Sequence, residues 1–222
     1  MNGTYENIDC MELMANLKDK EIDLAIVDPP YGIIDKIISG GNRKNSIDMR
    51  KEMSKYDIAP SGDYFNELMR VSKNQIIWGA NYFTKSLPHS RGWIVWDKTD
   101  IPFGFSMAMS ELAFSSFNTN MKIVRLATCK NKIHANEKPV KLYEWLLSNY
   151  AKPNDLILDT HCGSASSLIA CENLGFRYIA SELDKDYYHQ SLQRLEAHLA
   201  QGKLFQRVGR DEIQISQPSM FA

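Results

Sequence analysis

The chain has 222 residues, of which 44% are hydrophobic, and this length and composition suit one ordinary α/β domain with a proper core. A formal net charge of −1 excludes a protein that is held on nucleic acid by bulk positive charge alone. No run approaches the roughly 18 apolar residues of a membrane helix, and the first residues lack the layout of a secretory signal, so we expect a cytoplasmic protein without a membrane partner. The four cysteines are scattered, which predicts free thiols and no metal site.

Short aliphatic runs alternate with segments of helical period, as in βαβ units around a mainly parallel sheet. In chain order, strands are expected at 24–27, 75–79, 93–97, 110–116, 122–128, 156–159 and 177–182. Helices are expected at 61–73, 138–152, 166–174 and 184–200. No amphipathic helix separates the strands between 93 and 128, so we predict that the last two of them are antiparallel. Residues 1–202 are expected to form a single domain and 203–222 a tail.

Two predicted strands stop in an aspartate, Asp28 and Asp159. Ligands of an open parallel sheet bind beyond the carboxyl ends of its strands, so we expect both aspartates to face one crevice. After Asp159, Gly163 lets backbone N–H groups approach a ligand, and Glu182 ends the next strand, where an acidic residue commonly holds ribose hydroxyls. The pattern G-x-G-x-x-G is absent, which favours an adenosine ligand without phosphates. The alternative is a tight turn with a solvated Glu182.

Residues 28–31 read Asp-Pro-Pro-Tyr. The two prolines fix two φ angles and force the residue before each of them to be extended, so the Asp28 carboxylate and the Pro29 carbonyl form a rigid pair of acceptors. A planar exocyclic amine can donate one hydrogen to each while its ring stacks on Tyr31. Pulling both hydrogens out of the ring plane frees the nitrogen lone pair to attack an electrophilic methyl group. The alternative is a strand ended by prolines, with Tyr31 packing on the surface.

This tetrad resembles the catalytic motif of the amino-group DNA methyltransferases, which use S-adenosylmethionine to modify adenine N6 or cytosine N4. The catalytic motif precedes the donor loop "LILDTHCGSAS", an order that resembles the β-class enzymes, many of them from bacteriophages and restriction-modification systems. The resemblance covers most of the chain and implies a Rossmann-like methyltransferase fold with helices on both faces. The loop departs from the usual D-P-F-x-G-S-G-T at Thr160, His161, Ala165 and Ser166, and Ala165 costs backbone freedom.

The resemblance also implies the roles of individual residues. The catalytic set is Asp28, Pro29, Pro30 and Tyr31; the donor-binding set is Asp9, Asp28, His134, Lys138, Asp159, Thr160, His161, Gly163, Ser164 and Glu182. Within the second set, Glu182 is expected at the ribose, Asp9 near the adenine of the donor, and His134 either at the donor carboxylate or merely exposed. Trp78 and Tyr82 are expected in the core and at the rim, rather than as a platform for a base.

Aspartate as the first residue of the tetrad favours adenine, so the predicted activity is N6-adenine methylation of double-stranded DNA after base flipping, in a bacterial or phage-infected cell. The alternatives are N4-cytosine methylation of DNA, methylation of RNA or of a protein amide, and a binding module that retains the fold, with or without the donor pocket, and acts by occupying DNA or a replication partner. Oligomeric state is open, a homodimer included.

Two further segments are assigned to partners. Residues 33–57 carry a local basic excess and are expected to form a flap that closes over DNA through Lys36, Arg43, Lys44, Arg50 and Lys51, the alternative being a solvated loop. "QPSMF", Gln217–Phe221, resembles the pentapeptide by which bacterial replication proteins dock on the sliding clamp. The alternative there is that Phe221 packs on its own domain.

Overall fold

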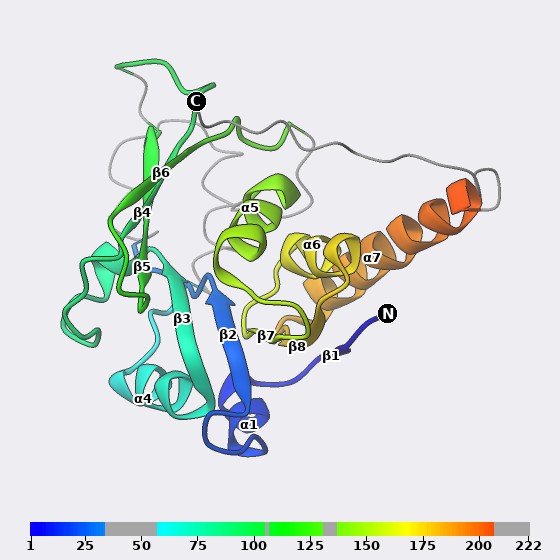
Figure 1. The fold of residues 1–222 in the computed structure, drawn as a ribbon, viewed down its shortest axis with the longest axis horizontal. Coiled ribbons are helices and arrows are strands. Elements are labelled where there is room, and N and C mark those ends of the chain that lie inside the picture. Colours follow the sequence, from blue (N-terminus) through cyan, green and yellow to red (C-terminus); the bar gives the residue numbers. More distant parts are fainter. Residues whose placement is uncertain (34–56, 105–106, 131–136, 207–222) are drawn as a thin grey trace, which may run out of the picture.

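The computed structural model describes residues 1–33, 57–104, 107–130 and 137–206. At its centre is an eight-stranded sheet with the order β1-β8-β7-β2-β3-β5-β4-β6 (Figure 1). The strands are β1 (Thr4–Glu6), β2 (Ile22–Val27), β3 (Ser72–Trp78), β4 (Ile94–Asp97), β5 (Ser110–Ser115), β6 (Lys122–Arg125), β7 (Leu156–Asp159) and β8 (Arg177–Ser181). All pairings are parallel except those of β5 with β3 and β4, so the predicted α/β fold with a mainly parallel sheet is confirmed.

Helices cover both faces of this sheet (Figure 1). They are α1 (Cys10–Ala15), α4 (Gly62–Val71), the short 3₁₀ helix η2 (Ala80–Tyr82), α5 (Val140–Tyr150), α6 (Ser166–Leu174) and α7 (Lys185–Gln206). Leu24 and Ile26 of β2 join the core cluster under α5, α6 and α7, whereas Ala25 and Val27 join the cluster under α1 and α4. Because successive side chains of a strand point to opposite faces, a strand covered on both sides reads as an unbroken apolar run.

The predicted strands and helices are all present, with ends that differ by a few residues. Two short elements, β1 and α1, were not predicted from the sequence. The expected antiparallel pair is only half correct: β5 and β6 run in opposite directions, but they are not neighbours, because β6 lies beyond β4 and pairs parallel to it. The predicted boundary at residue 202 falls inside α7.

Several predicted segments lie outside the described residues. They are the basic flap with Lys36, Arg43, Lys44, Arg50 and Lys51, the donor-carboxylate candidate His134, and the pentapeptide Gln217–Phe221. Of the helices that the structure describes, including the 22-residue α7, none combines the length and the apolar character needed to cross a bilayer.

Candidate active site

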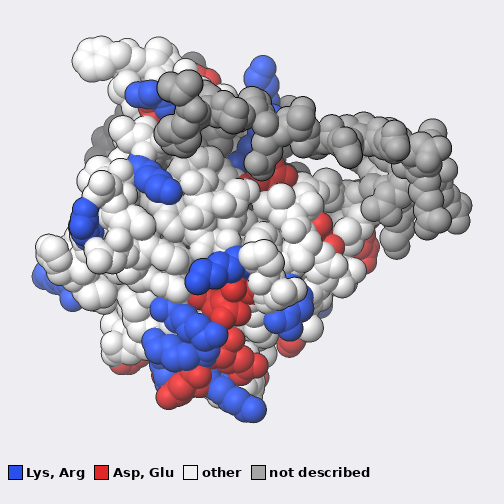
Figure 2. All heavy atoms as spheres, viewed as in Figure 1, with Lys and Arg blue, Asp and Glu red and all other residues white. Residues whose placement is uncertain are grey.

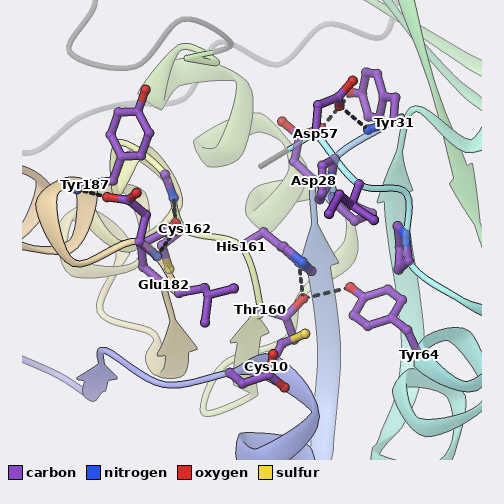
Figure 3. Close-up of a pocket in the computed structure, with 18 of the residues that line it drawn as sticks. Cys10, Asp28, Tyr31, Asp57, Tyr64, Thr160, His161, Cys162, Glu182 and Tyr187 are labelled. Carbon is purple, nitrogen blue, oxygen red and sulfur yellow. Dashed lines mark hydrogen bonds between the residues drawn. The ribbon is translucent and has the colours of Figure 1, made fainter. Parts of the chain in front are cut away.

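The two aspartate-ended strands are neighbours in the sheet. Ala25 of β2 lies opposite Leu158 of β7 in a parallel pair, so both strands deliver their carboxyl ends to one edge. A cavity of about 400 Å³ opens there, between residues 28–31 and 160–164 (Figure 3). The predicted residues that line it are Asp9, Asp28, Pro29, Pro30, Tyr31, Lys138, Thr160, His161, Gly163, Ser164 and Glu182.

Asp28 is held by a partner on each oxygen. The Tyr31 hydroxyl donates to Oδ1 at 2.7 Å, and the Lys138 ammonium pairs with Oδ2. The Lys138 side chain is only 2% exposed, so its charge is committed to carboxylates inside the protein. Lys138 therefore contacts the tetrad 28–31, whereas the family resemblance implied a place in the donor-binding set.

The chain just after the tetrad is fixed by a carboxylate from the far end of the predicted flap. Backbone N–H groups of Tyr31, Gly32 and Ile33 all donate to Asp57, at 3.0, 3.0 and 2.7 Å. Figure 3 shows Asp57 beside Tyr31. Gly32 adopts φ +67°, which lets successive N–H groups converge on one anion. Asp57 was not predicted as a site residue, because only the fold brings it back to the tetrad.

The Tyr31 ring has a defined aromatic setting. It stacks on Tyr82 with ring centroids 5.1 Å apart and an interplanar angle of 21°, and it meets Phe83 edge-on. Tyr82 is 49% exposed and Trp78 is fully buried, as predicted for a rim and a core residue. One face of the candidate stacking ring is thus covered by a second, half-exposed tyrosine.

The donor loop turns around Glu182. Its carboxylate accepts from the backbone N–H groups of Gly163 at 2.8 Å and Asp184 at 3.0 Å, which ties the loop after β7 to the end of β8. Burial raises the pKa of Glu182, although both N–H donors lower it. Asp9 lies nearby as the N-cap of α1, where it accepts from the N–H of Met11 at 2.8 Å.

Asp159 lies behind this loop and is buried, accepting from the Ser167 hydroxyl and from the backbone N–H of His161 at 3.0 Å. Burial raises its pKa to about 7, against those two donors, and the charges of Asp28 and Glu182 raise it further. The expectation that Asp159 faces the crevice is wrong: its carboxylate is buried behind the loop and does not line the cavity, so it shapes the loop from within.

His161 lines the cavity as a neutral group. Its Nδ1 lies 2.9 Å from the Thr160 hydroxyl, which lies 2.7 Å from the Tyr64 hydroxyl of α4 (Figure 3). Burial lowers the pKa of His161 to about 4, so the imidazole is uncharged near neutral pH. Tyr64 was not predicted as a site residue, because no local sequence pattern distinguishes it from its neighbours in the helix.

The family of DNA methylases that modify N6 or N4 amino groups matches residues 81–193, half of the chain. The chain belongs to this family and is a DNA methyltransferase. Among relatives, the putative methylase YubD of Escherichia coli (strain K12) is 24% identical over 216 residues, which cover 85% of this chain and 88% of YubD. The type II methyltransferase M.HinfI of Haemophilus influenzae is 25% identical, over 84% of this chain and 66% of its own.

Solved structures share the fold. The PvuII DNA methyltransferase, described as cytosine-N4-specific, superposes with a TM-score of 0.63 at 13% identity, over 94% of this chain and 93% of its own. A complex of M1.HpyAVI with SAM superposes with a TM-score of 0.59 at 19% identity, over 86% of this chain and 99% of its own. The Rossmann-like methyltransferase fold expected from the resemblance is therefore confirmed.

Proposed function

We propose that this DNA methyltransferase transfers a methyl group from S-adenosylmethionine to adenine N6 in double-stranded DNA, after the target nucleotide is flipped out of the helix. One observation carries the proposal: the tetrad 28–31 and the loop 160–164 face the same cavity. A methyl acceptor held by the tetrad and a donor held by the loop would then meet without a further rearrangement of the sheet.

The residues present fit such a donor. The cavity of about 400 Å³ lies within the range of about 300 to 1,000 Å³ that is usual for small-molecule sites. Glu182 keeps carboxylate lone pairs beyond those used by Gly163 and Asp184, which suits ribose hydroxyls. Asp9 and Leu183 line the same end of the cavity and suit the adenine of the donor. When bound, S-adenosylmethionine supplies an electrophilic methyl group on a sulfonium.

The protein's own part in the reaction is to hold the acceptor. Asp28 and the Pro29 carbonyl accept the two hydrogens of the exocyclic amine, which turns the nitrogen lone pair toward the donor end of the cavity. The ring of the target base stacks on Tyr31. If it uses the face that Tyr82 covers in this structure, it displaces the Tyr82 ring. The aspartate of the tetrad supports adenine over cytosine as the target.

The test is tritiated methyl transfer to unmethylated duplex DNA, RNA and a protein extract, followed by nucleoside analysis. We expect label in N6-methyladenine of DNA. Label in N4-methylcytosine would contradict the choice of base, and label in RNA alone would contradict the choice of substrate.

The role of the tetrad is tested by Asp28→Ala. Lys138 keeps Glu111 as a partner in this variant, so we expect a folded protein that binds S-adenosylmethionine nearly as the parent does but transfers no methyl group. Loss of donor binding by calorimetry would mean that the two ends of the cavity have been assigned the wrong way round.

A further inference from the structure

Four charged side chains form a row that ends at the catalytic aspartate. Lys98 Nζ lies 2.6 Å from Glu111 Oε1, Glu111 Oε2 lies 3.1 Å from Lys138 Nζ, and Lys138 pairs with Asp28. The charges alternate along the row and sum to zero. The four residues come from the end of β4, from β5, from the segment before α5, and from the end of β2, so only the fold brings them together.

The row is shielded from water. The exposed fractions of the side chains are 2% for Lys138, 10% for Lys98, 16% for Asp28 and 22% for Glu111. Taking charges out of water is costly unless each has a partner, and interactions between charges are stronger in such an interior than at a surface. Removal of one member therefore changes the field at its neighbours more than the loss of a surface ion pair would.

Lys138 alone would work against the proposed reaction. The donor is a cation, and the attacking amine gains positive charge as the methyl group arrives, so both favour a negative Asp28. An ammonium paired directly with Asp28 cancels that charge. Glu111 faces the same ammonium from the opposite side, and it offsets the Lys138 charge while leaving the ammonium as a donor that fixes the Asp28 carboxylate.

We propose that Glu111 is a positioning residue for methyl transfer: it holds Lys138 against Asp28 and offsets its charge, so that Asp28 stays both oriented and negative toward the amine. Lys98 in turn pairs with Glu111 and holds it in position. This inference rests on the proposed function, because it assigns the row to the amine-binding end of that same cavity.

The pH at which Lys138 loses its proton distinguishes the proposed role of Glu111 from a purely structural one, because a purely structural role would not shift it. Burial lowers the pKa of Lys138, but Asp28 and Glu111 outweigh burial and raise it above its ordinary value. The other groups facing the ammonium are the Tyr31 hydroxyl at 3.4 Å and the Trp78 ring at 5.4 Å, with Tyr143 of α5 beside Asp28. Burial raises the pKa of Glu111, whereas Lys138 and Lys98 together lower it to about 2. When Glu111 is replaced by a neutral residue, only Asp28 opposes the effect of burial on the pKa of Lys138, so Lys138 loses its proton at lower pH. The neutral amine no longer pairs with the Asp28 carboxylate as an ion, so we expect this deprotonation to set the alkaline limb of the activity profile.

The experiment compares Glu111→Gln with the parent in full pH profiles of kcat for DNA methylation, alongside calorimetry with S-adenosylmethionine. We expect kcat to fall at least about tenfold at neutral pH, the affinity for S-adenosylmethionine to change less than about threefold, and the alkaline limb to move down by about one pH unit or more. Glu111→Asp, which keeps the charge, is expected to restore the position of the alkaline limb. The matched control is Glu67→Gln, which removes a glutamate paired with Arg70 at 2.8 Å on α4 and should leave the profile unchanged.

A folded Glu111→Gln protein with parental kcat, or with reduced kcat and an unmoved alkaline limb, would overturn the inference. If this variant does not fold, Lys98→Gln combined with Glu111→Gln removes an ion pair instead of one charge, and the same fall in the alkaline limb is expected. A parent protein without methyl transfer would contradict the proposed function, whereas an active parent with an indifferent Glu111 would contradict only this inference.

Discussion

Tyr31 can lie where it does only because residue 79 has no side chain. Gly79 adopts φ +65°, and a Cβ there would lie 2.1 Å from Cε1 of the Tyr31 ring. Such a contact is shorter than any that real Cβ atoms make, so either the ring or the turn after β3 must shift. The position of the stacking ring is thus set by a residue outside the tetrad.

We therefore predict that Gly79→Ala lowers kcat at least about tenfold by displacing Tyr31, and lowers the free energy of unfolding by about 1 to 2 kcal/mol through the left-handed backbone. Steady-state methylation and urea unfolding measure the two effects. The control is Gly175→Ala, at φ +74° with nothing within 4 Å of the added carbon, which should lose stability but keep kcat. Equal catalytic losses in the two variants would rule out a specific effect on Tyr31.

Two buried groups of the donor loop give opposite pH dependences. Burial, opposed by Ser167 and the His161 N–H, raises the pKa of Asp159 from 3.8 to about 7, so its stabilising contribution is present below about pH 4 and is lost as pH rises through 7. Burial lowers the pKa of His161 from 6.5 to about 4, so its contribution is present above about pH 6.5 and is lost as pH falls toward 4. In the parent protein the two trends oppose each other between about pH 4 and 6.5.

In Asp159→Asn, the contribution of Asp159 to the pH dependence of stability is removed, and only that of His161 remains. We predict that acidification from pH 6.5 to 4 then lowers the free energy of unfolding more steeply than in the parent, by on the order of 3 kcal/mol. The asparagine oxygen still accepts from the His161 N–H, so the loop is expected to persist. Urea unfolding across this pH range measures the difference, and parallel curves for variant and parent would mean that Asp159 is ionised in the folded protein.

At the scale of elements, α7 supports the donor loop through one arginine. Arg194 donates to the Ser164 carbonyl at 2.7 Å and to the Ser166 hydroxyl at 3.0 Å, and it pairs with Glu137 at 3.0 Å. Between the two serines, Ala165 is fully buried and adopts φ +58°, a conformation that costs a residue with a Cβ about 1 kcal/mol. The arginine thus fixes both sides of a strained alanine at the start of α6.

Arg194→Met is predicted to raise the Kd for S-adenosylmethionine about tenfold with a smaller effect on kcat, because the loop loses two hydrogen bonds but the catalytic tetrad is untouched. Calorimetry measures the affinity. Arg177→Met, which removes an arginine bonded to the Asn154 carbonyl at the far end of β8, is the control and should bind the donor normally. Adding Ala165→Gly to Arg194→Met should recover much of the affinity, and no recovery would show that backbone strain is not what Arg194 opposes.

How far the sequence predicts this fold depends on how much each element buries. β2, β3 and β7 lie inside the sheet and read as apolar runs, so they were predicted. β1 has one buried residue among three and α1 has two among six, too few for a periodic signal. The neighbours of β5 and β6 were missed because alternation of side chains specifies a strand but not its partner.

The candidate site divides in the same way. The tetrad and the donor loop are short segments whose chemistry is local, so their shared cavity was predicted, although Asp159 does not line it. Glu111 and Lys98 were missed because each is an ordinary charged residue at the end of a strand, and only the order of β2, β3, β5 and β4 in the sheet brings them to Lys138. Contacts of this kind have no signature in a single sequence.

For the whole molecule, the described surface offers little net positive charge to DNA. Figure 2 shows Lys and Arg side chains beside Asp and Glu on the lower part of this face, over the region where Figure 1 places α1 and the start of β2. Arg70 pairs with Asp19 and Glu67, and Lys73 pairs with Asp23. Cations that are paired in this way add little to the attraction of a phosphate backbone. We therefore expect the basic segment 33–57 to supply most of the contacts with DNA phosphates.

Counterion release makes that hypothesis quantitative. If Lys36, Arg43, Lys44, Arg50 and Lys51 each neutralise a phosphate, replacing all five by glutamine should reduce the magnitude of the slope of log K against log salt by about 4.5, with the largest loss of affinity at low salt. Fluorescence anisotropy with a labelled duplex over a salt series measures the slope. The control replaces Lys18, Lys73 and Lys152, exposed cations at the amino-terminal edge of the sheet, and should leave the slope unchanged. None of these five residues belongs to the proposed donor-binding set, so the variant with all five replacements should keep its affinity for S-adenosylmethionine. A slope equal to the parental one, in a protein that still binds the donor, would contradict the assignment of these residues to DNA.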